Sequence, residues 1–346
     1  MKKLVSLLCA FAMLMSMAAC GGSPTAQGGA ASGGDNSNST VVKYSVVFAS
    51  SGTQADGAEA LGNLIKERSD GRLKMEFYPS SQLGDKIATF EGLQIATIEM
   101  TECALTDLST FNSMWSVFSL PYLWDSGKQA IQTIMDPAVT EALEADMEAN
   151  GFKVIAWTDL GSRSIVNTKR AINTPADLHG LKIRCMEDAV LAAATTAMGA
   201  IATPLAFSEV YTGMQQGTLD GADYQIPNVY ASAWQEICPY MSLTEHFTIP
   251  DVVFVSKAWF DRLSAEDQQA LLDAGEAFTE QWNNEIWPNA TDSARAGLEE
   301  AGMTINEVDK EPFIQAVRPV IDGFLASATE EQKNLYDLLM ETREKY

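Results

Sequence analysis

Two arginines, Arg163 and Arg184, each lie in a short apolar run of the kind that forms a buried strand. The chain is strongly acidic, with 23 basic and 46 acidic residues and a formal net charge of −23, so a cation inside an apolar segment is unusual here. A guanidinium buried on a strand is costly unless an anion meets its planar set of N–H donors. That anion is either a structural carboxylate or a ligand, and the two arginines taken together favour a ligand.

Residue patterns typical of catalysis are missing from the sequence. It contains no GxSxG, Walker A, HExxH or GxGxxG motif, and its only histidines are His179 and His246. The cysteines Cys103, Cys185 and Cys238 have neither metal-ligand nor disulfide spacing, and we interpret them as small buried residues. We therefore expect no catalytic residues, no metal ligands and no cofactor. A secreted hydrolase that uses an unrecognised carboxylate pair is the weaker alternative.

The first forty residues have the pattern of an export and anchoring segment. A basic start and a short apolar run precede Ala18-Ala19-Cys20, which predicts a signal peptide over residues 1–19. Cysteine after two alanines resembles a bacterial lipobox, so Cys20 is the expected lipidation site, although an ordinary signal peptide is an alternative. Residues 20–40, rich in Gly and Ser, are the expected flexible tether. We expect an extracytoplasmic protein, in the periplasm or on the outer face of the cytoplasmic membrane, attached to that membrane by the lipid.

Strand and helix patterns alternate along the remaining part of the chain, which at about 300 residues is too long for one small core. This rhythm predicts an α/β fold of two lobes with mixed, mostly parallel sheets covered by helices. The expected strands are 42–48, 72–78, 98–101, 153–157, 164–167, 182–184, 219–222 and 252–256. The expected helices are 55–65, 85–94, 187–198, 208–216, 264–301, 312–325 and 330–345.

The helix over 264–301 is long enough to span both lobes, with an interruption expected at Pro288. Ser208 and Ser264 are the expected N-caps of their helices. We assign residues 41–161 and 250–289 to lobe I, and residues 162–249 and 290–346 to lobe II. Arg163 then opens one strand and Arg184 closes another, and in open α/β sheets ligands bind where strands end.

Six segments together resemble one known family, the extracytoplasmic solute receptors of tripartite ATP-independent periplasmic (TRAP) transporters. They occur in the family's order and at its spacing from about Val42 to the C-terminus. The segments are Tyr78-Pro-Ser-Ser-Gln-Leu-Gly84, Leu120-Pro-Tyr122, Gly161-Ser-Arg163 through Asn167, Thr174 through Arg184, Pro204 through Tyr211, and Leu219-Asp-Gly221.

The resemblance implies a periplasmic-binding-protein-like fold and a set of binding residues. It implies that Arg184 pairs with the substrate carboxylate in a bidentate manner and that Arg163 adds a second contact. Phe207 matches an aromatic residue that packs on the ligand's carbon skeleton, and Ser50 and Ser51 match a loop that contacts its far end. The implied partners are a small organic acid and the membrane permease subunits. We expect a monomer and no nucleic acid partner, since the acidic chain repels phosphates.

The chain departs from the family pattern at positions near the implied ligand. Tyr224 stands where an asparagine is usual, and Gln225 follows it. Asp188 and Glu102 add carboxylates that would repel a second acidic group of a ligand but accept hydrogen bonds from hydroxyls. These departures favour a monocarboxylate with donor groups, such as a sugar acid, over a C4-dicarboxylate. A binding module that reports to a signalling receptor is a further alternative.

Overall fold

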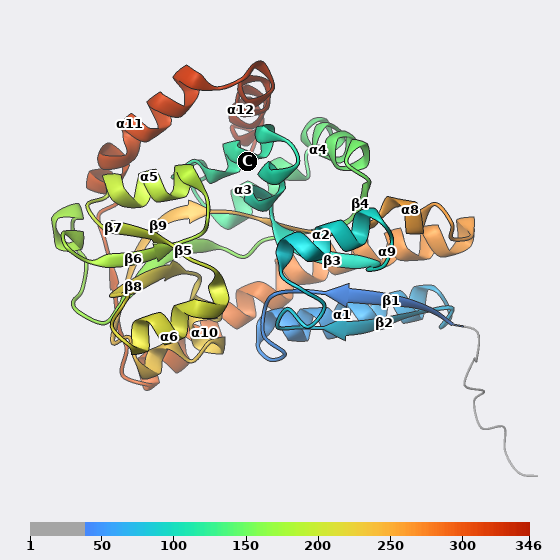
Figure 1. Ribbon diagram of the computed structural model, residues 1–346, viewed down its shortest axis with the longest axis horizontal. Coiled ribbons are helices and arrows are strands. Elements are labelled where there is room, and N and C mark those ends of the chain that lie inside the picture. The colour runs from blue at the N-terminus through green and yellow to red at the C-terminus, as the bar shows by residue number, and fades with distance from the viewer. Residues whose placement is uncertain (1–38) are drawn as a thin grey trace, which may run out of the picture. The chain divides into compact units, whose positions relative to one another are not determined.

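The structure, a computed structural model, describes residues 39–346, and in them two mixed β-sheets each lie between layers of helices (Figure 1). One sheet has the strand order β2-β1-β3-β10-β4 and defines lobe I; the other has the order β11-β9-β5-β8-β6-β7 and defines lobe II. The predicted two-lobed α/β fold is thereby confirmed. The expected signal peptide, Cys20 and nearly all of the expected tether lie outside the described residues.

Lobe I contains the first sheet and the helices around it. Its strands are β1 (Thr40–Ser45), β2 (Leu73–Tyr78), β3 (Met100–Ala104), β4 (Phe152–Thr158) and β10 (Asp251–Ser256). Its helices are α1 (Thr53–Arg68), α2 (Lys86–Gln94), α3 (Gly127–Ile134), α4 (Pro137–Ala149), α8 (Lys257–Phe260), α9 (Ala265–Gln281) and α12 (Glu330–Arg343), with the 3₁₀ turns η1 (Leu105–Thr110) and η2 (Ser113–Ser119). β10 is antiparallel to both of its neighbours, β3 and β4.

Lobe II contains the second sheet. Its strands are β5 (Ser162–Asn167), β6 (Lys182–Cys185), β7 (Ile201–Pro204), β8 (Gly221–Tyr224), β9 (Tyr240–Thr248) and β11 (Thr304–Glu307). Its helices are α5 (Ala189–Ala197), α6 (Val210–Gln215), α7 (Ile226–Ala231), α10 (Trp287–Glu300) and α11 (Glu311–Ser327), with the short turns η3 (Pro175–Leu178), η4 (Phe207–Glu209) and η5 (Trp234–Glu236).

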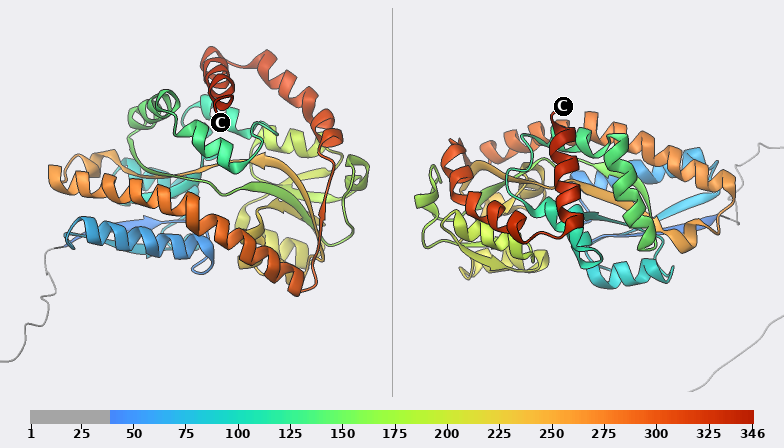
Figure 2. Two further views of the ribbon diagram at one scale, coloured as in Figure 1. Left: turned by 180° about the vertical axis from the view of Figure 1, so that it is seen from behind. Right: turned by 90° about the horizontal axis from the view of Figure 1, so that it is seen from above.

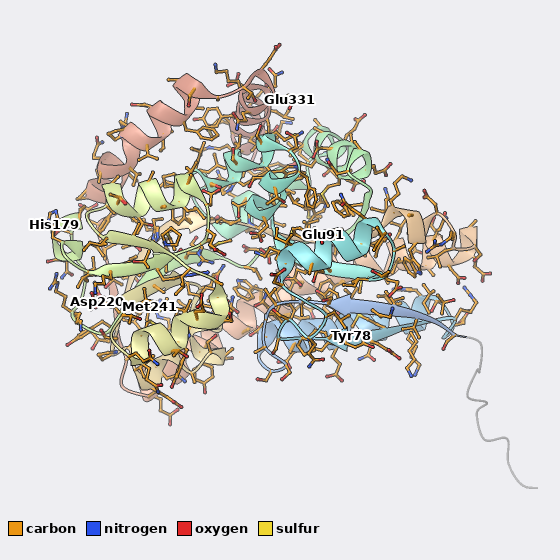
Figure 3. The ribbon with its side chains drawn as sticks, in the orientation of Figure 1. Tyr78, Glu91, His179, Asp220, Met241 and Glu331 are labelled. Carbon is orange, nitrogen blue, oxygen red and sulfur yellow. The ribbon has the colours of Figure 1, made fainter. Side chains whose placement is uncertain are left out.

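Each sheet buries an apolar layer on both of its faces. In lobe I, α1 and α9 pack through Leu61 and Phe278 against one face, while α2 packs through Phe90 against the other. In lobe II, α5 and α11 cover one face and α6, α7 and α10 cover the other. Side chains fill the space between the layers, whereas His179 lies at the outer edge of lobe II (Figure 3). Because each lobe has its own apolar core, a cleft can lie at the boundary between the two lobes.

The long helix that joins the lobes is interrupted by a π-helical turn, η6 (Trp282–Ile286), and not at Pro288 itself. Proline lacks an N–H and its ring crowds the carbonyl one turn earlier, so the helix widens just before it. In the view from behind, the interrupted helix lies in front and runs along both lobes (Figure 2, left). Ser264 is the N-cap of α9, as predicted, and accepts a hydrogen bond from the backbone N–H of Asp267. The prediction of Ser208 as an N-cap is wrong, because Ser208 lies inside η4 and α6 begins at Val210 without a side-chain cap.

The C-terminal helix α12 lies on lobe I, where it packs against η2, α3 and α4. The structure thus differs here from the expected assignment of all residues 290–346 to lobe II. The difference follows from the apolar face of α12, since Leu335 and Leu339 join the core that Phe90 and Phe118 form in lobe I. Among the described residues, no helix combines the length and apolar character that crossing a membrane requires.

Candidate functional site

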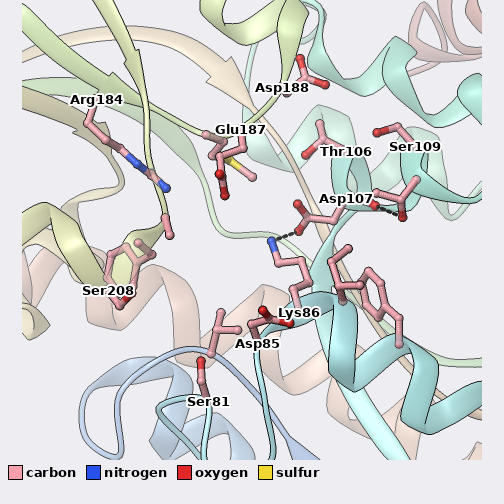
Figure 4. Close-up of a pocket in the computed structure, with 17 residues that line it drawn as sticks. Ser81, Asp85, Lys86, Thr106, Asp107, Ser109, Arg184, Glu187, Asp188 and Ser208 are labelled. Carbon is pink, nitrogen blue, oxygen red and sulfur yellow. Dashed lines mark hydrogen bonds and ion pairs between the residues drawn. The ribbon is translucent and has the colours of Figure 1, made fainter.

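Two adjoining cavities lie between the lobes, with volumes of about 320 and 110 Å³. Arg184, Met186 and Phe207 from lobe II line both of them, and so do Lys86 and Asp107 from lobe I. Figure 4 shows Arg184 entering the larger cavity from one side while Lys86 and Asp107 face it from the other. A cleft with cations from both lobes is a site suited to a small anion.

Arg184 is held in place by the backbone but has no anionic partner in residues 39–346. Its strand β6 lies between β7 and β8, and the residue is only 5% exposed. Nε donates to the carbonyl oxygen of Leu205 at 2.8 Å, whereas neither terminal nitrogen is in a hydrogen bond or ion pair within that range. Burial, together with the nearby charge of Arg163, lowers the pKa of Arg184. The outer edge of this guanidinium is therefore available to a carboxylate from the cavity.

Arg163 is already paired within the protein. Its Nε donates to Oδ2 of Asp223 at 2.5 Å, and its Nη2 donates to the Asp223 carbonyl oxygen at 2.8 Å and to Oδ1 at 3.3 Å. Although burial alone would lower the pKa of Arg163, the charge of Asp223 raises it. His246 lies behind this pair with Nε2 3.9 Å from Asp223 Oδ2, and burial lowers the pKa of His246 to about 4, so it is neutral.

An aromatic wall from lobe II closes one side of the smaller cavity. Tyr224 stacks on Trp234 with ring centroids 5.1 Å apart, and Phe207 lies 5.2 Å from Tyr224. The Arg163 guanidinium lies 5.2 Å from the centre of the Tyr224 ring, which adds a cation–π contact. The Tyr224 hydroxyl makes no hydrogen bond to any described residue, and burial raises the pKa of this phenol to about 12. Tyr224 and Phe207 thus present an apolar surface with one uncommitted hydroxyl.

Glu102 enters the smaller cavity from the lobe I side. Its carboxylate accepts hydrogen bonds from Tyr44 Oη at 2.6 Å and from Gln54 Nε2 at 3.4 Å. Asp251 of β10 lines the same cavity. The sequence reading did not single out Asp251, because its position beside Glu102 depends on β10 pairing with β3.

Asp188 lines the larger cavity, but its oxygens have partners in the protein. Oδ1 accepts hydrogen bonds from the backbone N–H groups of Val190 and Leu191 as the N-cap of α5. Oδ2 accepts a hydrogen bond from Ser119 Oγ at 3.0 Å. These contacts favour a role for Asp188 in positioning α5 over lobe I.

The remaining predicted residues lie around the smaller cavity. Gln225 is buried in its wall, and its Oε1 accepts a hydrogen bond from Asn228 Nδ2 at 3.2 Å. Ser51 lines a small hollow beside Tyr224, and Ser50 is exposed next to it. Gly52 follows with φ of 93°, and a Cβ there would lie 2.6 Å from Ala231 of lobe II. This loop therefore needs glycine to approach the opposite lobe so closely.

The sequence reading also missed the ion pair between Lys86 and Asp107. Lys86 follows Asp85, the N-cap of α2, and its Nζ lies 2.5 Å from Asp107 Oδ2 in η1. Burial alone would lower the pKa of Lys86, but the charge of Asp107 raises it. The available signal was the position of Lys86 two residues after the Tyr78–Gly84 motif. Within residues 39–346, no group of three or more His, Cys, Asp or Glu side chains is placed to bind a metal ion.

The chain is similar to known proteins in sequence and in structure. Residues 44–328 match the family model of the bacterial extracellular solute-binding proteins, family 7. The chain is 32% identical over 288 residues to the 2,3-diketo-L-gulonate-binding periplasmic protein YiaO of Escherichia coli (strain K12), which covers 81% of this chain and 87% of that protein.

Two solved structures of TRAP periplasmic solute binding proteins are similar over most of their length. The protein from Chromohalobacter salexigens, with bound D-glucuronate, has a TM-score of 0.82 and 27% identity, covering 88% of this chain and 100% of the other. The protein from Sulfitobacter sp. NAS-14.1, with bound β-D-galacturonate, has a TM-score of 0.81 and 28% identity, covering 87% of this chain and 99% of the other.

Proposed function

Because this chain belongs to the family 7 extracellular solute-binding proteins, the solute receptors of TRAP transporters, we propose that it captures a sugar acid through Arg184. In this proposal the ligand is a polyhydroxylated monocarboxylate that lies in the cleft between the lobes. The closed receptor then delivers it to the membrane permease.

One observation carries the proposal: Arg184 is a buried cation whose terminal nitrogens meet no anion among the described residues. Such a charge is unfavourable in the empty cleft and becomes favourable when a carboxylate binds in a bidentate manner. Arg163 cannot offer the same anchor, since Asp223 occupies its guanidinium. Arg163 instead positions Tyr224 beneath it and adds positive potential near the bound carboxylate.

The rest of the cleft suits a ligand rich in hydroxyl groups. Phe207 and Tyr224 offer a flat apolar surface to a carbon skeleton, while Glu102 and Gln225 offer acceptors and donors around it. The C. salexigens and Sulfitobacter relatives have bound D-glucuronate and β-D-galacturonate, which combine one carboxylate with several hydroxyls. These ligands support a sugar acid here.

Closure of the lobes on the ligand requires no chemistry, only better contacts in the closed form than in the open form. Excluding water from the cleft strengthens the attraction between Arg184 and the ligand carboxylate, because the effective dielectric falls. Such a closure would bend the segments that connect the two lobes. These segments lie near Gly161, Pro250 and Trp282.

A thermal-shift screen of the purified protein tests the proposed ligand class. D-Glucuronate, D-galacturonate and D-erythronate represent sugar acids, succinate represents C4-dicarboxylates, and D-glucose is the uncharged control. We expect stabilisation by at least one sugar acid and none by glucose. Stabilisation by succinate alone would mean that the ligand is a C4-dicarboxylate and not a sugar acid. Turnover of a bound acid would indicate an enzyme.

We also propose that the mature receptor is a lipid-anchored monomer, attached to the membrane through Cys20 after removal of residues 1–19. The residues around Cys20 that resemble a lipobox support this. Replacing Cys20 with serine should release the protein from the membrane fraction into the soluble fraction. Membrane retention of Cys20→Ser equal to that of the wild type would contradict lipidation.

A further inference from the structure

Two carboxyl side chains, those of Glu102 and Asp251, lie together at the lobe I side of the smaller cavity. In the antiparallel pairing of β3 and β10, Ala104 faces Asp251 and Glu102 faces Val253. Residues two apart on a strand share a face, so Glu102 and Asp251 are diagonal neighbours on the same face of the sheet. Both side chains also line the smaller cavity, so their carboxyl groups lie on one face of the sheet and border one space.

The two members of this acid pair differ in their other contacts. Glu102 accepts hydrogen bonds from Tyr44 and Gln54. Asp251 is 7% exposed, and the described residues offer its side chain neither a hydrogen-bond donor nor an ion pair. The residue instead borders the smaller cavity. A buried carboxyl without a protein donor is placed to accept hydrogen bonds from a ligand.

Full ionisation of the acid pair is unfavourable. Two like charges at neighbouring positions on one face of a buried sheet disfavour double ionisation. Burial raises the pKa of Asp251 well above its ordinary value, and the charge of Glu102 raises it further. Burial also raises the pKa of Glu102.

The cations around the pair are committed elsewhere. Lys86 pairs with Asp107, and Arg163 pairs with Asp223. Arg184, which lines the same cavity, is therefore the cation left to a ligand in this part of the structure. The cleft thus places one available cation and one acid pair around a common space. A ligand that matches it carries a carboxylate at one end and hydrogen-bond donors at the other.

We propose that Glu102 and Asp251 form a second recognition subsite that accepts hydroxyl groups of the ligand and excludes a second carboxylate. This inference rests on the proposed function, because it assumes that Arg184 binds the first carboxylate. A hydroxyl donates to the acid pair and satisfies the free oxygens of Asp251. A carboxylate at that place cannot donate, and it would bring another negative charge against the pair in a site that excludes water. The subsite therefore separates sugar monoacids from diacids of the same length.

Matched pairs of acids test the subsite directly. D-Glucarate has a second carboxylate in place of the aldehyde carbon that closes the ring of D-glucuronate, and galactarate differs from D-galacturonate in the same way. Because ring closure differs within each pair, the change of the affinity ratio between variants is what tests the subsite. Affinities for all four are measured by calorimetry with the wild type, Asp251→Asn and Glu102→Gln, which keep the side-chain volume and remove the acid. Asp261→Asn is the control, because Asp261 lines neither cavity and pairs with Lys257 on the surface of the protein. Urea unfolding of each variant confirms that it is folded.

For the wild type we expect each uronate to bind at least about 100-fold more tightly than its diacid, in line with sites whose buried polar groups reject a mismatched analogue. In Asp251→Asn, and separately in Glu102→Gln, this ratio should fall about tenfold or more, because an amide can donate to a carboxylate. The control should keep the wild-type ratio.

The inference is overturned if both acid-pair variants keep the wild-type ratio within about threefold while Arg184→Ala still abolishes uronate binding. That outcome would leave the proposed function intact. If Arg184→Ala still binds the uronates, that result would instead contradict the proposed function. A wild type that binds neither uronate would overturn both.

Discussion

Arg163 and Asp223 form a bidentate ion pair at the base of the cleft, with Nε 2.5 Å from Oδ2 and Nη2 3.3 Å from Oδ1. The pair spans the neighbouring strands β5 and β8, and both side chains are almost fully buried. Two arginines that look equivalent in the sequence are therefore different in the structure. Arg163 is paired with Asp223 within the protein, and Arg184 is left for the ligand.

Breaking the Arg163–Asp223 pair should destabilise the fold even without ligand. We expect Arg163→Met to lower the free energy of unfolding by roughly 3–5 kcal/mol, because it leaves the Asp223 carboxylate buried without its partner. Urea unfolding measures this change. Lys257→Met is the control, since the exposed Lys257–Asp261 pair should contribute at most about 0.5 kcal/mol. A loss below about 1 kcal/mol in Arg163→Met would contradict the structural role of the pair.

The Tyr224 hydroxyl should matter for binding and not for stability. It has no hydrogen-bond partner among the described residues, so Tyr224→Phe should unfold at the wild-type urea concentration. We expect affinity for the bound sugar acid to fall about fivefold to tenfold, which corresponds to one hydrogen bond.

The matched control for this substitution is Tyr122→Phe. Tyr122 Oη donates to the Thr244 carbonyl oxygen at 3.0 Å, so its removal should lower stability and leave affinity unchanged. If Tyr224→Phe binds as tightly as the wild type, the hydroxyl does not contact the ligand.

Asp188 should act through helix α5. Asp188→Ala removes an N-cap and should cost about 1 kcal/mol of stability, whereas Asp188→Asn keeps a capping side chain and should cost little. We expect the ranking of ligands in a thermal-shift panel to be the same for Asp188→Asn and the wild type. A changed ranking would mean that the Asp188 carboxylate contacts the ligand after all.

Asp159, where the chain crosses from lobe I to lobe II, should make stability depend on pH. Burial raises the pKa of Asp159 from its ordinary 3.8 to about 6, although a hydrogen bond from the Gly161 N–H opposes this. The folded state then binds a proton before the unfolded state as pH falls, so this group adds stability below about pH 4 and loses it as pH rises through 6.

The substitution Asp159→Asn removes this titration. It should raise the free energy of unfolding at pH 8 by about 1–2 kcal/mol, a value reduced for partial exposure, and should have little effect at pH 4. Urea unfolding of both proteins at the two pH values measures the difference. An equal difference at pH 4 and pH 8 would show that Asp159 is not the titrating group.

Local patterns predicted most helices and strands near the cleft, but not the strand β9. Its residues Ser242, Thr244 and His246 interrupt the apolar pattern, yet all three are fully buried. They can be buried because each has a hydrogen-bond partner nearby. Ser242 donates a hydrogen bond to Asn306, and the Thr244 hydroxyl is hydrogen-bonded to the His246 ring. Partners of this kind are set by the tertiary structure, and a local sequence pattern does not contain them.

The binding residues show the same division. Arg163 and Arg184 could be predicted because a cation in an apolar run is unusual in itself. The partner of Arg163 lies 60 residues away and is fixed by the pairing of β5 with β8. Asp251 was missed for a similar reason, because β10 returns from lobe II to insert beside β3 and so places Asp251 next to Glu102.

The most direct test of the account is calorimetry with wild type and Arg184→Ala, using the sugar acid that gives the largest thermal shift. We predict that the substitution weakens binding by about 100-fold or more, since it removes a bidentate charge-assisted contact. The ligand-free variant should be at least as stable as the wild type, because Arg184 is an unpaired buried cation in the empty cleft. Binding by Arg184→Ala within about threefold of the wild type would contradict the central claim that Arg184 anchors the ligand carboxylate.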